Sequence, residues 1–189
     1  ISSIAGIGIP GFTGDGAAAV DAKLNFPAGV AVEHSGNIYI TDTLNHRIRK
    51  IVAQQLTRIA GSGDNGDGIA AINAHVGRIG DIAYDSFNNL YIAEPYTHRI
   101  RKVDTSGFIL THAGTGSEYF NADNIQAVGA GIGYPQGLAF DASNNLYVAS
   151  EGNHRIRKIA PGGIITTVAG DGDKGFSGDG SPAVNAELD

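Results

Sequence analysis

The sequence predicts an all-β fold, and more specifically a β-propeller of four-stranded antiparallel blades. Three observations support this prediction. A basic hexapeptide recurs three times, at offsets of 52 and 56 residues, within a chain of 189 residues. Each repeat contains short runs rich in Val, Ile, Tyr and Thr, whereas no window shows the 3.6-residue period of a long helix. The 28 glycines are consistent with many tight turns. Four hairpin-linked strands at this period are typical of propeller blades.

Each repeat contains four predicted strands, always in the same order. In the first repeat they are AGVAVE (28–33), NIYITD (37–42), NHRIRK (45–50) and LTRIAG (56–61). The second repeat presents them at 80–85, 89–94, 97–102 and 109–114, and the third at 136–141, 145–150, 153–158 and 164–170. An unpaired copy of the fourth strand, SSIAG (2–6), opens the sequence.

The turn between the first and second strands contains one position with a special backbone requirement. Gly36, Asn88 and Asn144 occupy this position in the three repeats. Gly and Asn are the residues that best tolerate a positive φ angle. We therefore expect a left-handed backbone conformation at all three residues.

The series GVAV, GNIYITDT and NHRIRKI resembles the NHL repeat, which is named for an Asn-His-Leu signature. The likeness covers essentially the whole chain, although Arg follows the signature His in every copy and Thr97 replaces the Asn of the second copy. The resemblance implies a β-propeller, usually of six blades, that serves mostly as a rigid platform for binding.

This resemblance leads us to expect about three blades here, or half of a six-bladed ring. Both ends of the sequence fall within a repeat, so the remaining blades would come from the same polypeptide or from a second copy. The expected propeller segment, 1–189, divides into an orphan fourth strand with its connector (1–23) and three blades, each with the connector that follows it (24–75, 76–131 and 132–189).

The repeated hexapeptide holds nine of the thirteen Lys and Arg residues. Because a residue type repeated around a ring usually has a structural role, we assign one to Asn45, His46, Arg47, His98, Arg99, Asn153, His154 and Arg155. Strand alternation places Arg47 and Arg49 on one face, and His46 and Ile48 on the other. The arginine side chains are expected to reach carboxylates or carbonyl oxygens between blades. The expected carboxylates are Glu33, Asp85 and Asp141, which share one position of the repeat, and Asp42 and Glu94, which share another. A basic rim for phosphates is the alternative.

The connectors between blades vary more than the strands. Three of them span 18 positions, but the one that follows Gly61 spans 15. In the first and last, Phe12 and Phe176 are expected to plug the surface, and an Ala-rich stretch to form one helical turn. The connectors share a face, here called the loop face, with the loops at 42–45, 94–97 and 150–153. We expect ligand binding there, with the candidates Glu94, Tyr96, Glu118, Tyr119, Phe120 and Asp123.

The amino-acid composition limits the classes of partner and cofactor that this chain could bind. A net charge of −6 argues against nucleic acid as a partner, and no apolar run approaches the roughly 18 residues of a membrane span. The absence of cysteine excludes a thiolate metal site. GSGDNGDG (61–68) and GDGDKGFSGDG (170–180) superficially resemble calcium loops but complete no ligand series, so we expect no cofactor and keep calcium as an alternative. His34, His75 and His112 occur irregularly and form no metal motif.

These observations favour a non-catalytic propeller that binds a protein or a small extracellular ligand through its loop face. The alternative is a propeller hydrolase or lyase with a metal ion in the central channel. The sequence itself leaves the compartment open. The resemblance to NHL-repeat proteins favours an extracellular, cell-surface or periplasmic location within a larger protein or assembly.

Overall fold

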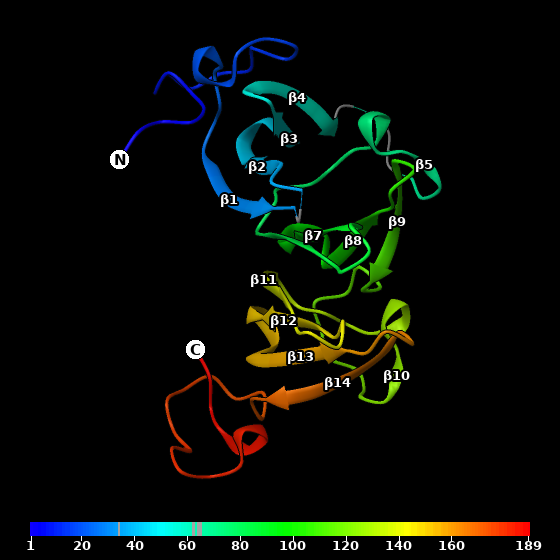
Figure 1. Cartoon of the computed structure of the whole chain (residues 1–189). Coiled ribbons are helices and arrows are strands. Elements are labelled where there is room, and N and C mark those ends of the chain that lie inside the picture. Colours follow the sequence, from blue (N-terminus) through cyan, green and yellow to red (C-terminus); the bar gives the residue numbers. More distant parts are fainter. Residues whose placement is uncertain (34, 62, 64–65) are drawn as a thin grey trace.

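A computed structural model describes residues 1–33, 35–61, 63 and 66–189, and it contains three antiparallel sheets that follow one another in chain order (Figure 1). Each sheet corresponds to one predicted repeat. Blade 1 consists of β1 (Pro27–Val32), β2 (Ile38–Asp42), β3 (Arg47–Val52) and β4 (Gln55–Ala60). Blade 2 consists of β6 (Ile82–Tyr84), β7 (Leu90–Glu94), β8 (Arg99–Val103) and β9 (Phe108–Ala113). Blade 3 consists of β11 (Pro135–Phe140), β12 (Leu146–Ser150), β13 (Arg155–Ile159) and β14 (Ile164–Ala169).

The strands of each blade pair with their sequence neighbours in the same register. Ile40, Ile92 and Val148 of the second strands lie opposite Arg49, Arg101 and Arg157 of the third strands. The predicted all-β fold and its four-stranded antiparallel blades are therefore confirmed. Among the described residues, every helix is a three-residue 3-10 turn, and no helix is long and apolar enough to cross a membrane.

The connectors add a short outer strand that the sequence did not reveal. In blade 2, β5 (Ile69–Ala70) pairs with β9, and in blade 3, β10 (Ile125–Gln126) pairs with β14. In blade 1 an isolated bridge joins Ala18 to Gln55. Each of these connectors thus hydrogen-bonds to the blade that follows it, whereas the sequence grouped it with the blade before. The expected helical turn is present as η1 (Ala19–Asp21), η3 (Ala71–Asn73), η5 (Ala127–Gly129) and η7 (Ala183–Asn185).

The loops between second and third strands are single 3-10 turns: η2 (Thr43–Asn45), η4 (Pro95–Thr97) and η6 (Glu151–Asn153). The residue that ends each turn is the signature histidine, in the left-handed conformation, with φ of 53°, 52° and 49° at His46, His98 and His154. The prediction that His46 lies within the strand was therefore wrong, because the strand begins one residue later. The His46 carbonyl also approaches Gly61 so closely that a side chain at position 61 would collide with it.

The turns between first and second strands have the predicted backbone. Gly36, Asn88 and Asn144 have φ angles of 88°, 64° and 63°. In blades 2 and 3, Asp85 and Asp141 support this turn, because each accepts hydrogen bonds from backbone amides within it. Position 34, which lies in the equivalent turn of blade 1, is outside the described residues.

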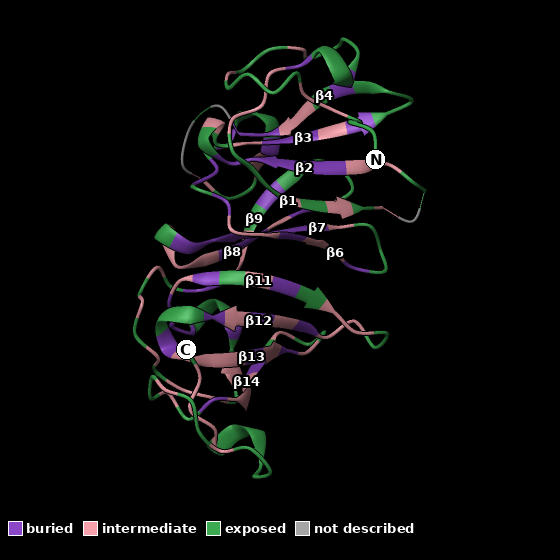
Figure 2. Ribbon diagram, turned by 90° about the vertical axis from the view of Figure 1, so that its left-hand side faces the viewer, coloured by how far each residue is buried: buried purple, intermediate pink, exposed green. Residues whose placement is uncertain are grey.

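The apolar core lies between successive blades. Tyr39 and Ile48 of blade 1 form one buried cluster with Ile82 and Ile92 of blade 2. A second cluster joins Tyr91 and Ile100 of blade 2 to residues of blade 3 such as Leu138 and Val148. Figure 2 shows β7, the second strand of the central blade, as buried along its length. The blades are therefore held face to face mainly by burial of aliphatic side chains.

Candidate functional site

An equivalent buried arginine ties the connector to the third strand in every blade. Arg49 Nη2 donates to the Thr13 carbonyl oxygen at 3.1 Å and lies 2.8 Å from Asp15 Oδ1. Arg101 Nη2 lies 2.9 Å from the Gly66 carbonyl oxygen and 2.7 Å from Asp67 Oδ1. Arg157 repeats the arrangement with the Ala122 carbonyl oxygen and Asp123 Oδ1, both at 3.0 Å. Such charge-assisted bonds fix each connector against its blade.

The second carboxylate that faces this arginine changes from blade to blade. Arg49 Nη1 donates to Asp42 Oδ2 at 3.2 Å, whereas Arg101 Nη1 lies 3.8 Å from Glu94 Oε2, which is an ion pair without a hydrogen bond. In blade 3 the residue is Ser150, and Nη1 and Nε of Arg157 have no hydrogen-bond partner among the described residues. Desolvation by burial accordingly lowers the pKa of Arg157, although the nearby Asp123 opposes this effect.

Of the two sets of carboxylates predicted to face the arginines, the structure confirms one. Asp42 and Glu94 face arginines as expected, but the prediction for Glu33, Asp85 and Asp141 was wrong. Asp85 Oδ2 instead accepts hydrogen bonds from Asn89 Nδ2 at 2.7 Å and the Tyr91 hydroxyl at 3.2 Å. Asp141 makes the same contacts with the asparagine and tyrosine of blade 3, and Glu33 with those of blade 1. These carboxylates follow the first strand, at the opposite end of the sheet from the loop face.

An aromatic ring from the connector covers the arginines in blades 1 and 3. The Phe12 ring centroid lies 3.9 Å from the Arg47 guanidinium carbon and 4.9 Å from that of Arg49. Phe120 lies over Arg155 and Arg157 at 4.2 Å and 4.8 Å. These distances are those of cation–π contacts. Phe12 thus lies over the arginines while remaining 39% exposed, whereas Phe176 of the last connector is 91% exposed.

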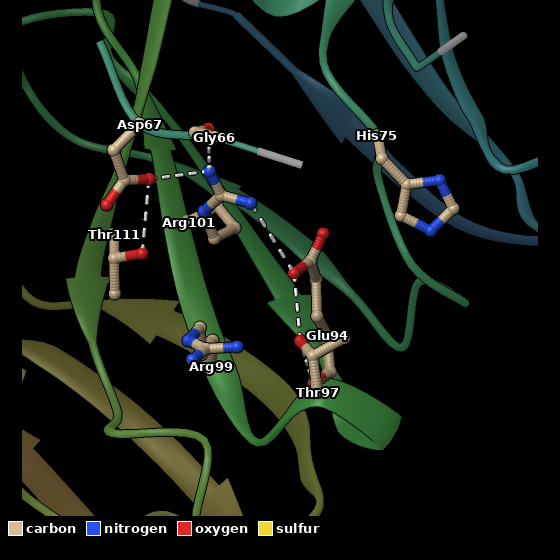
Figure 3. A pocket seen from close by; sticks show the side chains of 8 residues that line it. All are labelled: Gly66, Asp67, His75, Glu94, Thr97, Arg99, Arg101 and Thr111. Atoms are coloured by element: carbon tan, nitrogen blue, oxygen red, sulfur yellow. Dashed lines mark hydrogen bonds and ion pairs between the residues drawn. The ribbon is translucent and has the colours of Figure 1, made fainter. Parts of the chain in front are cut away.

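Blade 2 has a pocket at the corresponding place, with a volume of ≈ 410 Å³ (Figure 3). Arg101 lies at its centre, between Asp67 and Glu94, and the Arg99 side chain lies beside it. His75 lies on the other side of the opening. The described residues that line the pocket come from the connector, β7, η4, β8 and β9: Gly66, Asp67, His75, Glu94, Thr97, Arg99, Arg101 and Thr111.

The two carboxylates of this pocket are held by other side chains. Asp67 Oδ1 accepts a hydrogen bond from the Thr111 hydroxyl at 3.2 Å, in addition to the ion pair with Arg101. Burial by itself raises the pKa of Asp67, but the hydrogen bonds from Thr111 and the charge of Arg101 outweigh it and hold this pKa below its usual value. Glu94 is buried and accepts from the Gly77 amide at 2.9 Å and from the Thr97 hydroxyl at 2.9 Å. Their proximity to Arg101 makes both carboxylates fixed partners of that arginine.

The residues predicted to bind a ligand lie on the loop face but in different environments. Glu94 lines the pocket, while Tyr96 and Tyr119 are 61% and 74% exposed. The Glu118 carbonyl oxygen accepts a hydrogen bond from Asn153 Nδ2 at 2.6 Å. Phe120 and Asp123 contact the arginines of β13 and so anchor the third connector. The structure thus leaves Tyr96 and Tyr119 as exposed aromatic candidates.

The residues predicted to have structural roles connect neighbouring parts of the fold. Asn45 Nδ2 donates to the Gly11 carbonyl oxygen and to Asp42 Oδ1, both at 2.8 Å. Arg47 and Arg155 donate to the carbonyl oxygens of Asn45 and Asn153, and Arg99 to that of Thr115. The His46 ring stacks on His75 with ring centroids 6.0 Å apart. The His98 ring meets the Tyr134 ring edge-on, with centroids 4.7 Å apart. His154 lies near the last connector.

The pocket itself was missed by the sequence reasoning, although a signal for it existed. The connector at 61–75 is three positions shorter than the others and contains no Phe, Tyr or Trp. The covering ring of blades 1 and 3 is therefore absent from blade 2. Combining this deletion with the repeated arginines would have identified Arg99 and Arg101 as uncovered side chains.

Within the described part of the chain, no group of three or more His, Asp or Glu side chains is arranged to hold a metal ion. Of the two acidic loops considered for calcium, 61–68 includes residues outside the described set, and its Asp67 contacts Arg101. His34 also lies outside the described residues.

Sheets of this kind, packed face to face in chain order, define a β-propeller. The model of the NHL repeat matches residues 24–51 and 133–159, in blades 1 and 3. The chain therefore carries NHL repeats on a β-propeller fold. It is 28% identical over 183 residues to the human NHL repeat-containing protein 2, an alignment that covers 81% of this chain and 25% of that protein. The chain thus spans about a quarter of the length of this relative.

Solved structures with the same fold have different functions. An auxiliary nutrient binding protein of Bacteroides ovatus matches with a TM-score of 0.62 and 19% identity, over 82% of this chain and 39% of that one. A gluconolactonase of Xanthomonas campestris matches with a TM-score of 0.56 and 13% identity, over 82% and 52% of the two chains. At these identities the likeness establishes the fold alone.

Proposed function

We propose that this chain is a non-catalytic binding module, which presents its loop face to a protein or a small extracellular ligand. The observation that carries the proposal is the state of the two pocket carboxylates. Asp67 and Glu94 are engaged by Arg101 and by hydroxyl and amide donors. The lowered pKa of Asp67 keeps it ionised, which suits ion pairing better than proton transfer near neutral pH.

The variation among blades supports the same function. The interblade core and the arginine bonds repeat, whereas the loop face differs in each blade through Tyr96, Tyr119 and the open pocket. Function usually lies in loops that a rigid scaffold positions. An extracellular, cell-surface or periplasmic setting belongs to this proposal, because NHL-repeat resemblance and the nutrient-binding neighbours of the fold are consistent with it.

Partner capture tests the proposal. The wild-type chain, a Tyr96→Ala/Tyr119→Ala double variant and a Phe87→Ala control would be immobilised and exposed to extract of the native source. Phe87 is also an exposed aromatic residue, at 72%, but it lies in the turn between β6 and β7. We expect mass spectrometry to detect the same molecule on wild type and control, and at least tenfold less of it on the double variant. Equal capture by all three would contradict binding through this face.

The alternative enzyme function has a separate readout. Elemental analysis of the purified chain, combined with assays on the captured molecule, would reveal a metal-dependent hydrolase or lyase. Stoichiometric metal together with turnover would replace the proposed binding module by that alternative. Full partner binding by a metal-stripped preparation would support the binding module.

A further inference from the structure

The three blades provide an internal comparison of the same site. In blades 1 and 3 a pair of arginines from the third strand is stacked under a phenylalanine of the connector. In blade 2 the corresponding pair, Arg99 and Arg101, borders an open pocket of ≈ 410 Å³. The rest of the arrangement is retained, because Arg101 still contacts the connector through Gly66 and Asp67. The connector of blade 2 therefore differs from those of blades 1 and 3 by the missing ring.

We propose that this pocket binds an aromatic carboxylate, whose ring stacks on Arg99 and Arg101 as Phe12 and Phe120 stack on the arginines of the other blades. The inference rests on the proposed binding function and names its ligand class. Guanidinium groups attract the face of an aromatic ring, and the attraction increases where water is excluded. The two sister blades show that this geometry suits the fold.

The charge around the pocket accounts for the carboxylate. Arg101 is matched by Asp67 and Glu94. Arg99 has no ion pair within the described part of the chain, and its one recorded hydrogen bond there goes to the Thr115 carbonyl oxygen at 3.3 Å. A ligand carboxylate next to Arg99 would balance its charge, and the Thr97 hydroxyl and His75 offer further polar contacts at the rim.

The volume is sufficient for such a ligand. A protein cavity of about 150 Å³ holds a benzene molecule. The pocket volume of ≈ 410 Å³ therefore accommodates a ring, its carboxylate and a short substituent. A phosphate alone would leave the ring position empty, and the two neighbouring carboxylates would repel its higher charge.

Titration with benzoate, followed by NMR of the arginine Nε–H signals, tests the proposal directly. A stacked ring shifts the signals of Arg99 and Arg101 through its ring current, whereas a saturated ring has none. We expect benzoate to shift both signals and to bind at least threefold more tightly than cyclohexanecarboxylate, which lacks the aromatic face, and than benzyl alcohol, which lacks the charge. Equal affinity for benzoate and either control would overturn the proposal.

Two variants test whether the connector phenylalanine and the ligand ring occupy the same position. Replacing residues 62–66 with a copy of residues 7–14 gives blade 2 a connector of the length found in blade 1, with its phenylalanine. We expect this graft to abolish the shifts at Arg99 and Arg101. Conversely, Phe12→Ala should open an equivalent pocket and produce new benzoate shifts at Arg47 and Arg49. Undiminished shifts in the graft would overturn the assignment even if Phe12→Ala failed to fold.

The graft also separates this inference from the proposed function. It leaves Tyr96 and Tyr119 in place, so capture of a partner through those residues can be measured in the same variant. Loss of benzoate binding with retained capture would assign the pocket and the tyrosines to different ligands. Absence of benzoate binding in the wild type would reject the aromatic carboxylate while leaving the binding module standing.

Discussion

Asn144 combines a left-handed backbone with a contact between blades. Its φ is 63°, and its Oδ1 accepts a hydrogen bond from the Ser86 amide of blade 2 at 3.0 Å. A β-branched residue with positive φ is strained by on the order of 1–3 kcal/mol. We therefore expect Asn144→Val to lower the free energy of unfolding by about that amount in urea titrations. Asn144→Gly keeps the backbone freedom and should lose only about 1 kcal/mol, for the hydrogen bond. Wild-type stability of Asn144→Val would refute this view of the turn.

His112 is expected to make stability depend on pH. Burial, helped by the nearby positive charge of Lys102 and opposed by Asp85, lowers the pKa of His112 to about 4. An unfolded chain protonates this residue near its usual pKa of about 6.5, so the unfolded state binds more protons between these values. Stability is thus fully present above pH 6.5 and is lost as the pH falls. We expect a loss of about 2 kcal/mol between pH 7 and pH 5 that His112→Gln largely removes. Identical pH profiles of the two proteins would show that His112 is not the cause.

At the scale of single elements, the strands could be predicted well and the connectors could not. Short runs rich in Val, Ile, Tyr and Thr, repeated in the same order between turn residues, identify the strands. The outer strands β5 and β10 have only two residues each, too few for any alternation. The histidine at the start of the third strand was misplaced because the sequence shows no break between the turn and the strand. The left-handed residue His46 places its carbonyl oxygen against Gly61, so the turn involves a glycine that lies far along the sequence.

The candidate site shows the same division. Repetition was enough to assign structural roles to the hexapeptide residues, and Asp42 and Glu94 were recognised as arginine partners. The sequence could not decide which end of a blade a long arginine side chain reaches, so Asp85 and Asp141 were proposed as partners as well. The pocket exists because the connector of blade 2 is three positions shorter than the others and contains no Phe, Tyr or Trp. The shortened connector is visible in the sequence, but only the structure shows that the phenylalanine of the other connectors lies over the arginines.

The connector phenylalanine is expected to stabilise its blade as well as to close it. Phe120 lies over Arg155 and Arg157, and it is half-buried. Phe120→Ala removes this apolar contact and the cation–π attraction, so we expect the free energy of unfolding to fall by about 1–2 kcal/mol. Phe87→Ala, which removes an exposed ring, is the matched control and should change stability by less than about 0.5 kcal/mol. A small effect at both positions would mean that the rings close the surface without stabilising it.

On the scale of the whole molecule, one blade face stands out by its exposure. Val30 of β1, Ile82 of β6 and Leu138 of β11 occupy the same place in the three blades, opposite equivalent residues of the second strands. Ile82 and Leu138 are 3% and 9% exposed because the preceding blade covers them, whereas Val30 is 62% exposed. Val32, two residues further along the same face, is also exposed. Blade 1 therefore carries the apolar surface of an interblade contact without a blade against it.

We accordingly expect the 189-residue chain, prepared by itself, to associate through the Val30 face. Contiguous exposed apolar surface of this kind favours association in water. Size-exclusion chromatography with light scattering should therefore report a mass well above the 19.5 kDa of one chain. The Val30→Lys/Val32→Lys double variant places two charges on this face and should shift the population towards the monomer. Phe87→Lys is the control, because it changes an exposed apolar residue elsewhere and should leave the mass of the assembly unchanged. A monodisperse wild-type monomer with cooperative melting would refute this expectation and show that three blades are stable without a fourth.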